Sequence, residues 1–157
     1  MRPVHGMIRC GFVTFLSLGV AAGAAAGGKK GEPPNWKGGG SGTTRPEGGV
    51  HVDEFVGRTT RLGPFQGGGF HVLDPFDFTF WGEAAWTAQD GSSLRATYTG
   101  QVFPSGDPDY PFGFVAELVA VGGTGRLAGA QGRSTMNGGF TGDLFFDLEG
   151  SLDFHGK

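Results

Sequence analysis

Cysteine is almost missing from this sequence: Cys10 is the only one, and it lies near the N-terminus. A chain with one cysteine forms no internal disulfide and no zinc site of several cysteines. Metal binding would therefore fall to the histidines, which are not spaced as metal ligands: His5, His51, His71 and His155. We predict neither a bound metal nor a cofactor.

Charge is also scarce, and positive charge in particular. Charged residues make up 17% of the chain, below the usual quarter. The net charge is −3, and no lysine occurs between Lys37 and Lys157. Domains that bind nucleic acid generally carry a basic stripe. The composition therefore argues against a nucleic-acid partner.

Long hydrophobic runs are missing too. The longest apolar stretch, Gly11 to Ala26, is shorter than the ~20 residues that span a bilayer as a helix. Arg2 and Arg9 precede its core, and Ala24-Ala25-Ala26 ends it, which is the order of a secretory signal peptide. We predict a signal peptide over residues 1–26, a secreted, periplasmic or cell-surface location, and no membrane span after cleavage. An uncleaved membrane anchor is the alternative.

Residues 27–49 have no apolar periodicity and contain Gly38-Gly39-Gly40-Ser41-Gly42, with Trp36 as their only large apolar residue. Such a composition is typical of a flexible linker. We therefore predict a linker over residues 27–49 and one folded domain over residues 50–157.

Glycine and aromatic residues are both abundant in the rest of the chain. The 33 glycines are interleaved with 15 phenylalanines, whereas a disordered segment has few bulky apolar residues. Alternating polar and apolar residues, separated by turn signals, predict antiparallel strands. We expect strands over residues 50–56, 67–72, 76–88, 92–102, 112–121, 133–140 and 143–154, with a hairpin at Asp90-Gly91 and a Pro-rich loop from Pro104 to Pro111. In the last strand Leu144, Phe146, Leu148, Leu152 and Phe154 should face inward.

An eleven-residue segment occurs twice. Gly57 to Gly67 and Gly122 to Gly132 share six of eleven residues, and each copy joins two expected strands. Repeated corners in a strand-rich chain predict a pseudo-symmetric closed sheet. The Gly-rich segments Gly67-Gly68-Gly69 and Gly122-Gly123 fit tight turns with positive φ. Arg61 and Arg126 occupy matching corner positions, where we expect them to pair with a carboxylate or with strand-end carbonyls. Seven or eight antiparallel strands in sequence order favour an up-and-down barrel over a sandwich, and the predicted fold is an all-β, eight-stranded antiparallel up-and-down β-barrel.

The second corner, Gly122-Gly123-Thr124-Gly125-Arg126-Leu127-Ala128-Gly129, resembles a corner motif of the allene oxide cyclase barrel-like domains, whose superfamily includes the dirigent proteins. The run from Ala88 to Gly100 resembles the hairpin that bacterial members carry before that corner. The resemblance implies an eight-stranded barrel, trimers in plant members, and cyclisation or stereochemical control by a shaped apolar cavity without a cofactor. No catalytic motif of the family can be matched residue by residue to this chain.

Candidate site residues follow from the predicted strand faces. Glu83, Glu117 and Tyr98 are the candidate catalytic residues, because a carboxylate on an apolar face inside a cavity can act as an acid or base. Glu117 has an alternative place on the outer face, beside Val115, Val119 and Val121. Aromatic residues expected to face the lumen are candidate ligand contacts: Phe78, Phe80, Trp86, Tyr98, Phe114 and Phe146.

An outward apolar row of Val115, Val119 and Val121 predicts a homo-oligomer, most simply a trimer, because such a row is usually covered. For function, we expect a binding or structural module for a small apolar molecule or a protein partner. The alternatives are a cofactor-free isomerase or cyclase acting on a polyene or polyketide, and a cell-surface scaffold with a filled barrel. A lumen of at least ~300 Å³ favours a binder or a cyclase.

Overall fold

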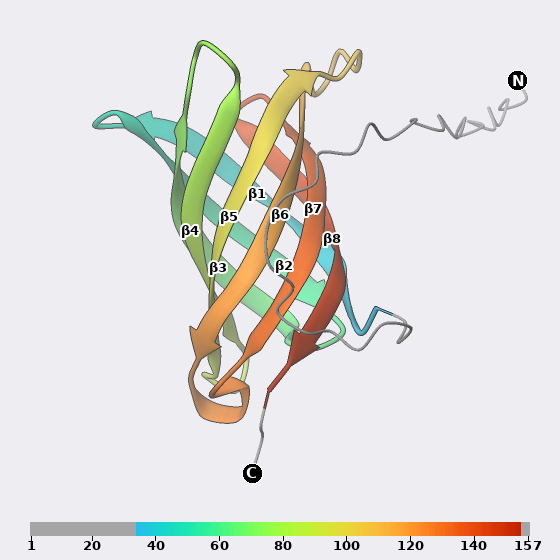
Figure 1. Cartoon of the computed structure of the whole chain (residues 1–157). Helices are drawn as coiled ribbons and strands as arrows, with labels where there is room; N and C mark the ends of the chain where they lie inside the picture. Colours follow the sequence, from blue (N-terminus) through green and yellow to red (C-terminus); the bar gives the residue numbers. More distant parts are fainter. Residues whose placement is uncertain (1–33, 155–157) are drawn as a thin grey trace, which may run out of the picture.

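A computed structural model describes residues 34–154 as a closed barrel in which eight antiparallel strands follow one another in sequence order (Figure 1). The predicted all-β up-and-down barrel is thereby confirmed. The predicted signal peptide and the first part of the predicted linker lie outside the described residues. A short 3-10 helix, η1 (Gly125–Leu127), is the one helical turn of the described part. The strands are β1 (Trp36–Glu47), β2 (Val50–Thr59), β3 (Gly63–Leu73), β4 (Thr79–Ala88), β5 (Ser93–Pro104), β6 (Phe112–Gly123), β7 (Gln131–Phe140) and β8 (Asp143–Asp153).

The prediction of a linker up to residue 49 is wrong, because most of that segment is strand β1. β1 pairs with β2 on one side and with β8 on the other, so it closes the barrel. Its glycines lie where neighbouring groups leave no space; a Cβ at Gly40 would lie 2.9 Å from the Phe146 ring. Trp36 is fully buried. The strand exists because both of its edges are hydrogen-bonded, which its own composition does not reveal.

Glycine and aromatic residues are abundant together because they pack against each other across the inner wall. A Cβ at Gly57 would lie 2.6 Å from the Phe65 ring, and one at Gly100 would lie 2.6 Å from the Phe80 ring. The Gly138 backbone makes the same kind of space for Phe114. Large rings therefore pack against bare backbone, which lets a narrow barrel hold many aromatic residues. The same packing corrects our assignment of Gly67 to Gly69, which lie inside β3 and not in a turn.

One end of the barrel is closed by the two repeated corners. Leu62 of the first corner and Leu127 of the second are 2% and 0% exposed and plug this end. Arg126 donates hydrogen bonds from Nη1 to the Arg61 carbonyl and from Nη2 to the Leu62 carbonyl, at 2.6 and 2.7 Å. Its Nε donates to Asp90 at 2.7 Å. The expected pairing of Arg126 with a carboxylate and with strand-end carbonyls is confirmed, whereas Arg61 lies over the Phe154 ring at 5.3 Å.

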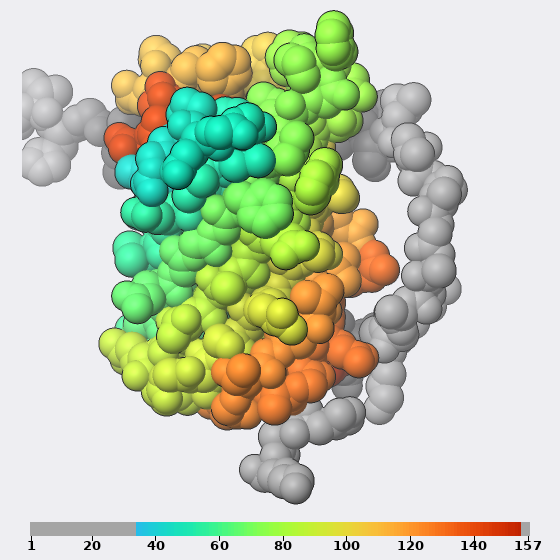
Figure 2. Space-filling model, turned by 90° about the vertical axis from the view of Figure 1, so that its left-hand side faces the viewer, coloured from blue at the N-terminus to red at the C-terminus, as the bar shows by residue number. Residues whose placement is uncertain are grey.

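The other end carries the β3–β4 loop, which projects from the barrel in Figure 2. β4 begins at Thr79 and not at Phe76 as predicted. The Asp74 carboxylate accepts a hydrogen bond from the Phe76 N–H, and Asp77 accepts one from the Thr79 N–H. These local bonds hold the chain in turns instead of extending the strand. Phe76 and Phe78 are consequently exposed, at 93% and 51%.

The wall itself alternates as expected. Along β8, Phe146, Leu148 and Leu152 are buried, whereas Phe145 is 38% exposed. Along β6, Val115 and Val121 face outward and are 41% and 53% exposed. Figure 2 shows the wall over β3, β4 and β5 without an opening into the lumen. The lumen cavity is lined by residues near the end opposite the two corners, such as Thr44, His71 and Phe140, and we take this end as the entrance.

Candidate functional site

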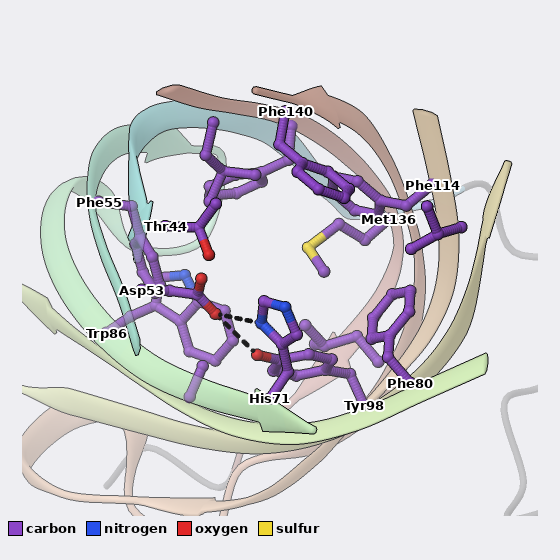
Figure 3. Close-up of a pocket in the computed structure, with 15 residues that line it drawn as sticks. Thr44, Asp53, Phe55, His71, Phe80, Trp86, Tyr98, Phe114, Met136 and Phe140 are labelled. Carbon is purple, nitrogen blue, oxygen red and sulfur yellow. Dashed lines mark hydrogen bonds and ion pairs between the residues drawn. The ribbon is translucent and has the colours of Figure 1, made fainter. Parts of the chain in front are cut away.

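The lumen contains a cavity of about 60 Å³ in the half away from the corners. Its walls are aromatic and aliphatic, and the half-buried Phe140 and Leu144 lie at its outer edge. Five of the six predicted ligand contacts line it: Phe80, Trp86, Tyr98, Phe114 and Phe146 (Figure 3). Phe78 does not line it, because the turn before β4 places that residue outside.

One polar cluster interrupts this apolar wall. Asp53 of β2 is only 5% exposed. Its Oδ2 accepts a hydrogen bond from His71 Nδ1 of β3 at 2.9 Å and one from the Tyr98 hydroxyl of β5 at 3.2 Å (Figure 3). The Tyr98 hydroxyl also lies 3.1 Å from the Phe70 carbonyl. Three strands thus hold one carboxylate in place.

Elementary chemistry assigns the protons in this cluster. An ionised carboxylate only accepts hydrogen bonds, so His71 carries a proton on Nδ1. Burial raises the pKa of Tyr98, and the nearby Asp53 charge raises it further. Tyr98 therefore stays a neutral donor that orients Asp53. This is a positioning role for a residue that we considered as a candidate catalytic residue.

Asp53 keeps one oxygen without a partner. Its Oδ1 is buried and has no hydrogen-bond partner among the described residues, and the same holds for the Thr44 hydroxyl oxygen. Both side chains line the cavity and point into the lumen in Figure 3. Leaving a buried polar group unpaired costs about 1–3 kcal/mol, and more for a charged one. An unpaired carboxylate oxygen at a cavity wall is therefore suited to a ligand that donates a hydrogen bond.

His51 forms the back of the cluster. It lies directly opposite His71 in the β2–β3 ladder, and the two rings stack with centroids 4.8 Å apart. Burial lowers the pKa of His51, and the neighbouring His71 lowers it further. A neutral His51 therefore packs on His71 and fixes the orientation of that ring.

The two glutamates that we considered as cavity acids lie on the outside of the barrel. Glu83 is exposed on β4, and Glu117 is exposed on β6, where it forms an ion pair with Arg133. Both belong to the outward set of their strands, because the inward positions are taken by Ala84 and Leu118. The placement of Glu83 in the lumen is wrong, and for Glu117 the alternative place on the outer face is confirmed. The carboxylate in the lumen is Asp53.

Period-two alternation could have identified Asp53. It is two residues before Phe55, so the two side chains point to the same side of β2, and Phe55 is a core residue. His71 gave no such signal, because its contact with Asp53 depends on the β2–β3 register. A polar residue sharing a face with a core aromatic is the feature to look for.

The cavity volume restricts the chemistry. About 60 Å³ is well below the ~300 Å³ expected of a site for a drug-sized ligand. It is also below the ~150 Å³ that encloses one benzene molecule. The cavity holds a polar head group and a few carbon atoms, and any longer chain must leave through the open end.

Comparisons of the chain with protein-family models, curated proteins and solved structures found no match. Within residues 34–154 no group of three or more His, Cys, Asp and Glu side chains is arranged to hold a metal ion. The same part of the chain contains no helix that is long and apolar enough to cross a membrane.

Proposed function

We propose that the protein is a binding module that takes a small, slender, mainly apolar molecule with a hydrogen-bond-donating head group into the lumen of its barrel. The observation that carries this proposal is the buried Asp53 carboxylate, whose Oδ1 is unpaired at the wall of an otherwise apolar cavity. In a scaffold with a filled barrel, an unpaired buried carboxylate would lower the stability of the fold and give nothing in return. A cyclase acting on a polyene needs more enclosed space than about 60 Å³.

Binding of 1-hexanol tests this function. Met136 lines the cavity, so a ¹³C label on its methyl group reports directly on occupancy. We expect the Met136 signal to shift and saturate with a dissociation constant on the order of 1 mM, which corresponds to about 0.6 kcal/mol for each of the seven non-hydrogen atoms of hexanol.

Two alanines provide a matched control. Ala84 lines the cavity, whereas its neighbour Ala85 is exposed on the outer wall. Ala84→Leu should abolish the saturable shift, and Ala85→Leu should leave it unchanged. If hexanol gives no saturable shift up to its solubility limit, the lumen does not bind such molecules.

The same proposal includes the family and the location of the protein. The eight strands in sequence order and the two corners support an allene oxide cyclase barrel-like domain. The Arg, apolar and Ala-Ala-Ala order at the N-terminus supports export. Both point to a barrel that meets its ligand outside the cytoplasm.

We further propose that the outer face of β6 binds a second copy of the chain. Val115 and Val121 are exposed on this face, with Val119 between them and half-buried. An apolar row on a β-sheet is usually covered, and no helix of the described residues covers it.

Val119→Lys should shift this oligomer toward the monomer, because it would bury a charge without a partner. Light scattering at micromolar concentration measures the change, and Gln66→Lys, an exposed site on the distant strand β3, is the control for added charge. A wild-type mass equal to that of one chain would contradict the oligomer.

A further inference from the structure

The open end of the barrel is acidic. The four connections at this end span residues 47–50, 73–79, 104–112 and 140–143. They contain six carboxylates and no lysine or arginine: Glu47, Asp74, Asp77, Asp107, Asp109 and Asp143. Only Glu47 has an ion-pair partner among the described residues, namely Arg45 at 3.9 Å. The other five leave their negative charge uncompensated around the entrance.

The closed end is close to neutral. Its corners carry Arg61 and Arg126, Asp90 is paired with Arg126, and Asp153 ends β8 at the same end. The uncompensated negative charge is therefore concentrated at the entrance. A field of this kind attracts cations to the lumen and repels anions.

The interior of the barrel also favours a cation over an anion. Asp53 lies buried in the cavity wall, and its Oδ1 has no partner among the described residues. His71 and Tyr98 both donate to Oδ2, which leaves Oδ1 free to accept a hydrogen bond from a ligand. Phe55, Phe80 and Trp86 line the cavity, and the negative face of an aromatic ring attracts a cation.

We propose that the ligand of the lumen is a primary alkylamine, bound as its ammonium ion with an N–H group donating to Asp53 Oδ1. This inference rests on the proposed binding function and specifies its ligand. An alcohol could fill the same space and donate one hydrogen bond. The amine adds a positive charge, which both the acidic entrance and the buried carboxylate attract, whereas the alcohol donates to the same carboxylate without a charge of its own.

Four ligands of one chain length separate the contributions of charge and hydrogen bonding. We would titrate the full chain with hexylamine, 1-hexanol, hexanoate and hexyltrimethylammonium, and follow the Met136 methyl signal. Hexylamine should bind at least about tenfold more tightly than 1-hexanol, and hexanoate should not bind. Hexyltrimethylammonium keeps the charge but has no N–H donor, so it should bind no better than 1-hexanol.

Asp53→Asn is the variant that removes the buried charge and keeps the shape. It should bring hexylamine and 1-hexanol to equal affinity, because it weakens hexylamine binding more than 1-hexanol binding. Neutralising two entrance carboxylates with Asp107→Asn and Asp109→Asn should lower the affinity for hexylamine about twofold at low salt. In 0.5 M salt the screening length falls to about 4–5 Å, so this difference should disappear. The control is Asp147→Asn with Asp153→Asn, on the exposed outer wall.

Each outcome decides the inference. Equal affinity for hexylamine and 1-hexanol in the wild-type protein overturns it and leaves the binding function intact. An amine preference that survives Asp53→Asn also overturns it. Failure of all four ligands to bind overturns the binding function itself. If Asp53→Asn does not fold, the comparison of hexylamine with hexyltrimethylammonium in the wild-type protein decides, and equal affinity for these two overturns the contact with Oδ1.

Discussion

Replacing Trp36 by alanine should destabilise the protein by about 3–5 kcal/mol, the range for removing a fully buried large aromatic side chain. Trp36 is 0% exposed and packs edge-on against Trp86, with ring centroids 6.5 Å apart. It is the first residue of β1 and anchors that strand at the closed end, and β1 is the strand that completes the barrel. Its loss therefore opens a cavity next to the seam between β1 and β8.

Urea unfolding followed by circular dichroism measures this loss. Lys37→Ala is the matched control, because Lys37 is the next residue, is exposed, and pairs only with the exposed Glu149. That variant should stay within about 0.5 kcal/mol of the wild-type protein. Equal, small losses for both variants would mean that residues 36–47 are not part of the cooperative fold.

Replacing Phe146 by alanine should cost a similar amount, about 3–5 kcal/mol. The side chain is 3% exposed, contacts the ring of Phe55 with centroids 5.6 Å apart, and lies over Gly40. It is also part of the cavity wall, so the variant should enlarge the cavity and weaken its selectivity for slender ligands.

The neighbouring residue is the control for the register of β8. Phe145 is 38% exposed on the outer wall and packs against Tyr110. Phe145→Ala should cost about 1 kcal/mol in the monomer, well below the loss for Phe146→Ala. Denaturant melts of the two variants under identical conditions test this, and equal losses would contradict the inward and outward assignment.

Local sequence patterns were sufficient for most of the wall. Alternation along β5, β6 and β8 identified the inward residues because a strand has only two faces, and burial of one face forces polar residues to the other. The two repeated corners indicated a closed, pseudo-symmetric sheet, because both copies make the same tight connection between strands. Phe80, Trp86 and Phe114 could therefore be assigned to the lumen before any contact was known.

Two local patterns were misleading for physical reasons. The glycines of β1 have no side chains to alternate, so the strand gave no periodic signal, although its backbone pairs on both sides. In the sequence, Phe76 and Phe78 continue the alternating pattern of β4. In the structure the carboxylates of Asp74 and Asp77 accept nearby backbone N–H groups, which stops the strand at Thr79.

The sequence by itself determined the class of fold, the faces of most strands, and the aromatic character of the lumen, because these follow from alternation, turn chemistry and composition. Only the tertiary structure decided the site. Asp53, His71 and Tyr98 come from three strands, and the β2–β3 and β3–β4–β5 registers bring them together. The acidic entrance has the same origin, since closure of the barrel gathers four connections that are far apart in the chain into one ring.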